Sequence, residues 1–265
     1  MMFPAAVLYG SIFSVAVIFS MLGQGGGTLY TPIQVWLGVN FHVAATTSLF
    51  LIMVTSLSAT IVFRKARRVD WPLALVLESV TTLGGFAGGF YSKGFSGAFL
   101  SIVFAVVVAF AAFFMIRDFK LKPEATSKKN GFLSWQRQFG DRSYCVNLGI
   151  ALPISFIAGG MSGLIGVGGG ILKVPLMVLL LGIPMEIAVG SSAFMVGLTA
   201  LGGFSGHVLS GHWDWKTSLV LAVAVFIGAQ IGARLSIKAD KKKIRKGFGW
   251  FLLIISISMI FQALR

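Results

Sequence analysis

Cysteine is nearly absent from this chain of 265 residues, which contains Cys145 and no other. A single thiol excludes an internal disulfide framework, a cysteine-rich metal site and an iron–sulfur cluster. Acidic residues are also scarce, at 8 in total, and charged residues of both signs make up only 11% of the chain. Because a soluble domain has about a quarter of its residues charged, the composition excludes an ordinary soluble protein.

Apolar residues account for 56% of the chain. They form runs at about 4–22, 28–39, 43–63, 72–90, 95–117, 144–163, 171–183, 187–207, 215–235 and 247–264. Ten spans of about 20 residues with short loops would use nearly the whole length. The sequence therefore predicts an all-α integral membrane protein without a separate soluble domain. The first run has no basic n-region and no cleavage site, so we expect it to be a retained helix.

The net charge of +14 is best explained by membrane topology. Of the 22 Lys and Arg residues, 18 lie in or beside three loops, at 64–68, 117–142 and 234–246. Short loops rich in Lys and Arg stay on the cytoplasmic side. We therefore expect these loops in the cytoplasm, both termini in the periplasm, a lipid bilayer around the chain and no nucleic-acid partner. Whether the chain forms a homo-oligomer is left open.

The chain contains an internal repeat. Gly23–Pro32 aligns with Gly166–Pro175 at an offset of 143, with six identities in ten positions. At an offset of 144, the later matches include Ser48 with Ser192, Thr55 with Thr199, Asp70 with Asp214, Gly84 with Gly228 and Gly88 with Gly232. The basic loops lie at opposite ends of the two copies. We predict two inverted-topology repeats of about five segments each, at 1–117 and 144–265, joined by a cytoplasmic linker at 118–143.

The apolar runs 28–39 and 171–183 are too short to cross a hydrocarbon core of ~30 Å at 1.5 Å per residue. Each follows a glycine run, so we expect a half-helix or a re-entrant hairpin in each repeat, and spanning segments remain the alternative. A broken helix in a membrane must line protein or a water-filled cavity, and a helix start attracts anions. Glycines also permit close helix packing, which we favour for Gly84, Gly85, Gly88, Gly89, Gly228 and Gly232.

The candidate substrate-binding residues all lie at or near the two glycine breaks. They are Gln24, Gly25, Gly26, Gly27, Thr28, Thr47 and Ser48 in the first copy, and Gly168, Gly169, Gly170, Ile171, Lys173, Ser191 and Ser192 in the second. The four paired hydroxyls suit a site and a helix cap equally well.

Two charged side chains interrupt the apolar segments. Lys173 lies well inside an apolar stretch, where a cation is usually functional. It would add a full positive charge beside the helix start, unless it reaches an interface or pairs with Glu78. Glu78 is a candidate for proton coupling, unless its carboxyl reaches water.

We expect no metal, no cofactor and no enzymatic activity. His42, His207 and His212 lack ligand spacing, and the chain shows no catalytic triad, P-loop or nucleotide fingerprint.

The duplicated Gly-x-Gly-Gly-Gly-x-x-x-x-Pro element, with Gly-Ser-Ser at 190–192, resembles the TauE/SafE sulfite exporter family, also called the toluene-sulfonate uptake permeases. The resemblance covers essentially the whole chain, and it implies transport of a small sulfur-containing anion, such as sulfite or sulfoacetate, across a bacterial inner membrane. The first copy departs from the second in having Gln24 for Val167, Tyr30 for Lys173 and Thr46 for Gly190, so the halves are expected to contribute unequally to one site.

An inside-negative membrane drives anions outward by about 2.3 kcal/mol per charge per 100 mV. We therefore expect an exporter that works by alternating access. The alternatives are proton-coupled uptake of the same anions, a carrier of another small anion such as a carboxylate, and an anion channel. A membrane enzyme and a non-transporting scaffold are further alternatives from other classes.

Overall fold

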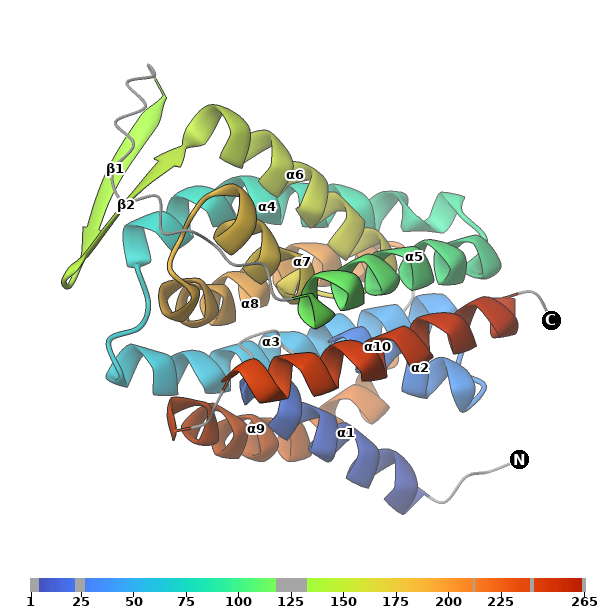
Figure 1. Cartoon of the computed structure of the whole chain (residues 1–265). Coiled ribbons are helices and arrows are strands. Elements are labelled where there is room, and N and C mark those ends of the chain that lie inside the picture. Colours follow the sequence, from blue (N-terminus) through green and yellow to red (C-terminus); the bar gives the residue numbers. More distant parts are fainter. Residues whose placement is uncertain (1–4, 22–26, 118–132, 212, 239–240, 264–265) are drawn as a thin grey trace.

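The computed structural model describes residues 5–21, 27–117, 133–211, 213–238 and 241–263. Figure 1 shows a bundle of helices with one β-hairpin at one end. The first half contains α1 (Ala5–Met21), α2 (Gly27–Trp36), α3 (Phe41–Lys65), α4 (Trp71–Tyr91), the 3-10 turn η1 (Ser92–Gly94) and α5 (Gly97–Ile116). The second half contains α6 (Leu148–Ile165), α7 (Gly170–Pro175), the π-helical segment η2 (Leu176–Leu180), α8 (Met185–Leu209), α9 (Trp215–Lys238) and α10 (Lys241–Ala263).

Among the described residues, six helices are long and apolar enough to cross a membrane. They are Phe41–Lys65, Trp71–Gly94, Gly97–Phe114, Leu148–Ile165, Met185–Leu209 and Trp215–Ile237, and shorter apolar helices cover Tyr9–Met21 and Leu252–Phe261. Large apolar side chains such as Leu83 and Phe261 are exposed, as a surface in contact with lipid requires. The chain is a helical, multi-pass membrane protein, and α2 and α7 are short, as predicted.

The polar stretch before α6 forms a β-hairpin, although only a linker was predicted there. Strand β1 (Ser134–Phe139) pairs antiparallel with β2 (Arg142–Asn147). The helix that was expected from 144 therefore begins at Leu148, where the side chain of Asn147 accepts a hydrogen bond from the N–H of Gly149 (3.0 Å). Tyr144 and Val146 of β2 are buried in an apolar cluster with the first turns of α4 and α8 and with η2. The hairpin thus joins the linker to the helical core.

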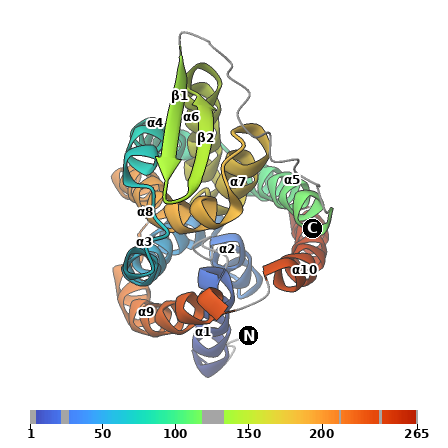
Figure 2. The same ribbon diagram turned by 60° about the vertical axis from the view of Figure 1, so that its left-hand side comes forward.

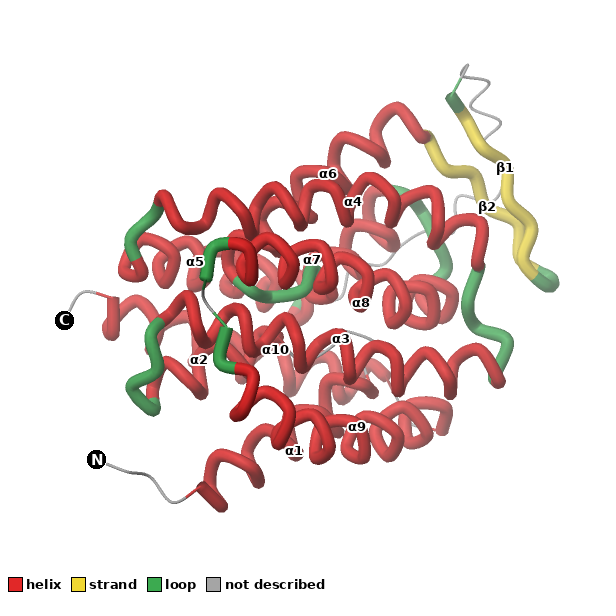
Figure 3. The backbone as a smooth tube through the Cα atoms, turned by 180° about the vertical axis from the view of Figure 1, so that it is seen from behind, coloured by secondary structure: helices red, strands yellow, loops and turns green. Residues whose placement is uncertain are grey.

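The described parts of the basic loops at 64–68, 133–142 and 234–238 lie at one end of the molecule. Figures 1 and 3 place the hairpin, the turn between α3 and α4 and the last residues of α9 at the same end. Helix α1 begins, and α10 ends, at the opposite end (Figure 1). This separation agrees with the charge pattern, and the side of the membrane that each end faces stays a prediction.

The helices of the two halves pack in matched pairs. Helix α4 packs against α6 and α8, whereas its sequence counterpart α9 packs against α1 and α3 (Figure 2). A methyl group on Gly88 would overlap the carbonyl oxygen of Gly160 on α6, and one on Gly232 would overlap that of Val17 on α1. Small residues bring membrane helices into such close contact. These matched contacts are what the predicted repeat requires, and its inverted orientation stays a prediction.

Candidate functional site

The second glycine run forms a loop that ends α6 and starts α7 (Figure 3). Gly166, Gly168 and Gly169 all adopt left-handed backbone conformations, with φ of 74°, 72° and 75°. Residues with a Cβ atom rarely adopt this conformation. A methyl group on Gly166 would overlap Ala45 of α3, and one on Gly168 would overlap Ile52 of the same helix. The glycines therefore allow the loop to turn sharply and to lie directly against α3.

The loop brings Lys173 into a buried cluster of polar side chains. The Lys173 ammonium lies 2.5 Å from Oε2 of Glu78 on α4 and also donates to the Thr199 hydroxyl on α8. Thr199 donates in turn to Oε1 of Glu78, as does Thr82 at 3.1 Å. The Lys173 and Glu78 side chains are only 5% and 1% exposed. Of the alternatives considered for Lys173, the structure therefore shows the pair with Glu78.

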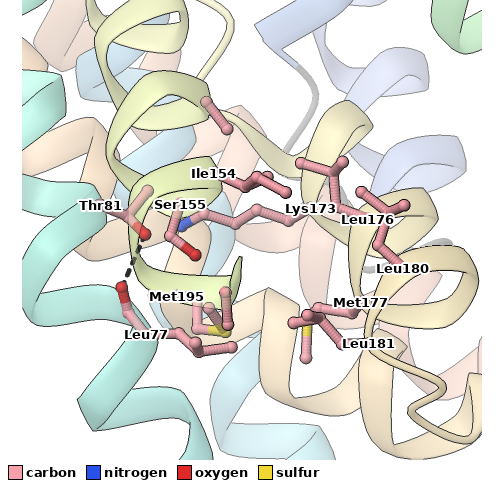
Figure 4. A pocket seen from close by; sticks show the side chains of 12 residues that line it. Leu77, Thr81, Ile154, Ser155, Lys173, Leu176, Met177, Leu180, Leu181 and Met195 are labelled. Atoms are coloured by element: carbon pink, nitrogen blue, oxygen red, sulfur yellow. Dashed lines mark hydrogen bonds between the residues drawn. The ribbon is translucent and has the colours of Figure 1, made fainter. Parts of the chain in front are cut away.

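A small pocket adjoins this cluster. Its lining residues come from α4, α6, α7, η2 and α8. Lys173 contributes a charge and Thr81 and Ser155 contribute hydroxyl groups, whereas most of the other lining side chains are apolar, such as Ile154 and Met195. In Figure 4 the Lys173 side chain extends across this pocket toward Thr81 and Ser155. The pocket thus presents one ammonium group and two hydroxyl groups on an otherwise apolar wall.

Ser162 has a buried hydroxyl without a hydrogen-bond partner in the described part of the chain. A methyl group on Gly169 would lie 3.3 Å from Oγ of Ser162 and 3.4 Å from Cε of Lys173. The hydroxyl therefore lies beside the glycine loop and close to the Lys173 side chain. Because unpaired buried polar groups are costly, Ser162 is a further candidate ligand-binding residue. It was not among the residues predicted from the sequence.

The first half contains an uncharged counterpart of the Lys173 cluster. Tyr30, which aligns with Lys173, is fully buried, and its hydroxyl lies 3.1 Å from that of Thr55, which aligns with Thr199. The position that corresponds to Glu78 is occupied by Ala222. Each half thus places a polar side chain of its short helix against a threonine. Of these two clusters, only the one around Lys173 carries charge, from Lys173 of the second half and Glu78 of the first.

The hydroxyl groups of Thr47, Ser191 and Ser192, which were predicted as site residues, form hydrogen bonds with groups other than Lys173. Ser191 accepts a hydrogen bond from the N–H of Asp70 (3.0 Å), and Thr47 accepts one from the Ser218 hydroxyl (3.3 Å). Ser192 donates to the carbonyl oxygen of Val189 (3.0 Å). Thr47 and Ser191 thus contact the starts of α9 and α4.

Ser48 belongs to a second buried polar cluster around α2. It accepts hydrogen bonds from Thr31 (2.9 Å) and Gln34 (3.2 Å) of that helix. Thr31 also lies 3.4 Å from the carbonyl oxygen of Gly166. Ser48 is therefore connected through Thr31 to the glycine loop of the other half.

Several predicted site residues have no described side-chain geometry. Gln24, Gly25 and Gly26 lie outside the described residues. Gly27 and Gly170 are the first residues of α2 and α7, and the side chains of Thr28 and Ile171 also lie outside the described part.

A second ionic cluster attaches the hairpin to α4. Asp70 is fully buried at the start of α4, where its side chain accepts a hydrogen bond from the N–H of Leu73. It also accepts hydrogen bonds from Arg137 of β1 (2.6 Å) and Tyr144 of β2 (2.5 Å). Burial and the bond to Asp70 raise the pKa of the Tyr144 phenol above its ordinary value, so its hydroxyl remains a donor. These bonds fix the hairpin to the helix that carries Glu78.

The sequence contained signals for some of the residues that were missed. Thr199 and Asp70 both have identical counterparts in the other repeat, Thr55 and Asp214. An identical pair at matched positions could have drawn attention to either residue. Nothing in the sequence pattern pointed to Ser162, because its role depends on an absent hydrogen bond.

Comparison with known proteins identifies similar transporters. The chain matches the family model described as sulfite exporter TauE/SafE over residues 8–259. It is 30% identical to the probable membrane transporter protein YunE of Bacillus subtilis over 273 residues, which covers 100% of this chain and 99% of that protein. It is 24% identical to the probable membrane transporter protein YfcA of Escherichia coli K12, covering 97% and 89% of the two chains.

An archaeal protein is also similar. The probable membrane transporter protein MJ0441 of Methanocaldococcus jannaschii is 22% identical, and the alignment covers 98% of this chain and 96% of that protein. No solved structure matches the chain.

Proposed function

Because the chain belongs to the TauE/SafE sulfite exporter family, we propose that it is a secondary transporter that exports a small sulfur-containing anion. The anion is sulfite or an organosulfonate such as sulfoacetate, and it crosses a bacterial inner membrane by alternating access. The relatives named above are described as probable membrane transporters, which supports transport over catalysis.

The observation that carries the choice of an anion is the buried ammonium group of Lys173. This side chain is buried, follows the glycine loop and lines the pocket. Burying a cation in a membrane protein is costly, and such residues usually serve function. The Ser162 hydroxyl, which has no hydrogen-bond partner among the described residues, lies beside the same loop and offers a further hydrogen bond to an oxyanion.

The direction of transport follows from what moves with the anion. An uncoupled carrier would release anions outward, because the inside-negative potential repels them by about 2.3 kcal/mol per charge per 100 mV. Uptake would need a cation to move inward with the anion. A second candidate function is uptake of the same anions together with a proton. The contact between Lys173 and Glu78 favours it, since Glu78 is a carboxylate that can take up a proton beside the proposed anion site.

The proposal is tested by ligand stabilisation of the purified protein in detergent. Sulfite, sulfoacetate, methanesulfonate, taurine, sulfate and short carboxylates would each be added, and the midpoint of thermal unfolding measured. We expect sulfur-containing anions to raise the midpoint for the wild type. Lys173→Ala and Gly169→Leu should abolish the increase, because the first removes the ammonium and the second fills the space beside Ser162.

The matched control is Lys216→Ala, which removes an exposed lysine near the start of α9 and should leave the stabilisation intact. Stabilisation by carboxylates alone would show that the substrate is another anion. A wild-type response that both site variants retain would show that the anion binds elsewhere. Saturable flux and counter-transport in liposomes would then distinguish a carrier from an anion channel.

A further inference from the structure

The buried cluster of Lys173, Glu78 and Thr199 contains both a cation that can bind the anion and a carboxylate that blocks it. Resting on the second candidate of the proposed function, proton-coupled uptake of the same anions, we propose that this cluster couples the anion to a proton. A proton on Glu78 frees Lys173 for the anion, so that one proton crosses the membrane with each monoanion.

The hydrogen bonds of the cluster define its resting state. Glu78 accepts from Lys173 at Oε2 and from Thr199 and Thr82 at Oε1. An ionised carboxylate can accept hydrogen bonds at both oxygens, and this arrangement of one ammonium and two hydroxyl donors fits that form. Lys173 uses two of its three N–H donors, on Glu78 and Thr199. The cation is therefore already neutralised by Glu78 before any substrate arrives.

The surroundings of the cluster leave Lys173 as the only charged partner of Glu78 among the described residues. Helices α5 and α6 contain no charged or histidine side chain. The other titratable groups on the surrounding elements lie at helix ends or on the hairpin: His42, Arg64 and Lys65 on α3, Glu186 and His207 on α8, Lys93 on η1, and Asp70 with the hairpin residues. Protonation of Glu78 therefore acts directly on Lys173.

The net charge of the buried cluster links binding of the anion to binding of the proton. If a monoanion entered beside the intact pair, the buried cluster would carry a net negative charge, which a medium of low dielectric constant strongly disfavours. If a proton enters as well, the cluster stays neutral. The proton bonds to Oε2 of Glu78, the hydrogen bond from Lys173 to that oxygen breaks, and a hydrogen bond from Lys173 to an oxygen of the anion forms. Each ligand thus promotes binding of the other.

The uncharged cluster in the first half supports a ratio of one proton to one anion. Its counterpart pair, Tyr30 and Thr55, is uncharged, and Ala222 stands where Glu78 would be. Among the described residues, Glu78 is therefore the one carboxylate paired with Lys173, and we assign one proton to each transport cycle. Cotransport of one proton with one monoanion moves no net charge, so its rate does not respond directly to the membrane potential.

The test uses the full-length protein in liposomes that contain a pH-sensitive dye. Methanesulfonate is the probe, because it is the anion of a strong acid and cannot itself carry a proton across the bilayer. An inward gradient of methanesulfonate should acidify the lumen by one proton per anion taken up. Clamping the potential to zero with valinomycin and potassium should leave the rate unchanged.

Glu78→Gln is the decisive variant, and Glu186→Gln is its control. Glu78→Gln should still bind methanesulfonate but should lose the acidification, and the pH dependence of methanesulfonate binding should disappear. The Glu186 side chain is 57% exposed and lies 3.6 Å from Arg142, so removing its charge should leave coupling intact. Lumen acidification and the pH dependence of methanesulfonate binding are also measured on the wild type. The proposal therefore remains falsifiable if Glu78→Gln does not fold.

The outcomes separate the two proposals. Methanesulfonate flux without acidification in the wild type would overturn proton coupling and leave the proposed function standing. Acidification that persists in Glu78→Gln would overturn the assignment to Glu78. If the wild type transports none of the sulfur-containing anions, the proposed function is wrong and the coupling proposal fails with it.

Discussion

The ion pair between Lys173 and Glu78 makes a quantitative prediction about stability. The two side chains are 5% and 1% exposed and are joined at 2.5 Å, so neither charge can be solvated by water if its partner is removed. Breaking a buried ion pair by removing one partner typically costs about 3–5 kcal/mol, whereas replacing both with neutral groups is often neutral or stabilising. A double-mutant cycle with Glu78→Gln and Lys173→Met measures this difference.

We expect each single variant to lose about 3–5 kcal/mol of unfolding free energy, by analogy with other buried ion pairs. The double variant should be close to the wild type, because it leaves no unpaired charge. The coupling energy from the cycle would then be several kcal/mol. Unfolding in mixed micelles, followed by tryptophan fluorescence, supplies the four free energies.

The pair between Arg142 and Glu186 provides an internal comparison. Its side chains are 55% and 57% exposed and 3.6 Å apart, and exposed pairs contribute about 0–1 kcal/mol. The same cycle, with Arg142→Met and Glu186→Gln, should therefore give a coupling energy in that range. If the two cycles give equal coupling energies, the reasoning about a desolvated pair is wrong.

Three further predictions concern packing, the hairpin and topology. Gly88→Ala should lower stability by about 1–3 kcal/mol through overpacking, whereas Gly10→Ala, which meets no atom within 4 Å, should be neutral or slightly stabilising in the same unfolding assay. Tyr144→Phe should cost about 1.5–3 kcal/mol by removing one hydrogen bond to a carboxylate, and an unchanged unfolding free energy would contradict the role given to this bond. Lys65→Cys, in a background where Cys145 is replaced by serine, should react with an impermeant thiol reagent only from the cytoplasmic side, and labelling from the periplasm would reverse the predicted topology.

Much of the fold could be predicted from the sequence. Hydropathy located the helices, and the glycine runs before 28–39 and 171–183 correctly predicted two short ones, α2 and α7. These features are local, because the length of an apolar run and the conformational freedom of glycine belong to a few neighbouring residues. The hairpin at 134–147 was not predicted, because its strands are stabilised by burying Tyr144 and Val146 against distant helices.

The candidate site could be predicted only in part. Lys173 and Glu78 were singled out because a charged residue in an apolar run is conspicuous in any sequence. Pairing was one of the alternatives weighed for Lys173, and the structure selected it. Thr199 and Ser162 were not singled out, since serine and threonine are common in membrane helices and become informative only through their contacts.

The sequence was sufficient to predict a helical membrane protein, the positions of most of its helices and the resemblance to a transporter family. Each of these depends on composition or on the order of residues along the chain. The contacts of Lys173 with Glu78, 95 residues away, and with Thr199, 26 residues away, were found only in the folded bundle. The reason is that such contacts depend on how α4, α7 and α8 pack, and packing is set by the whole bundle.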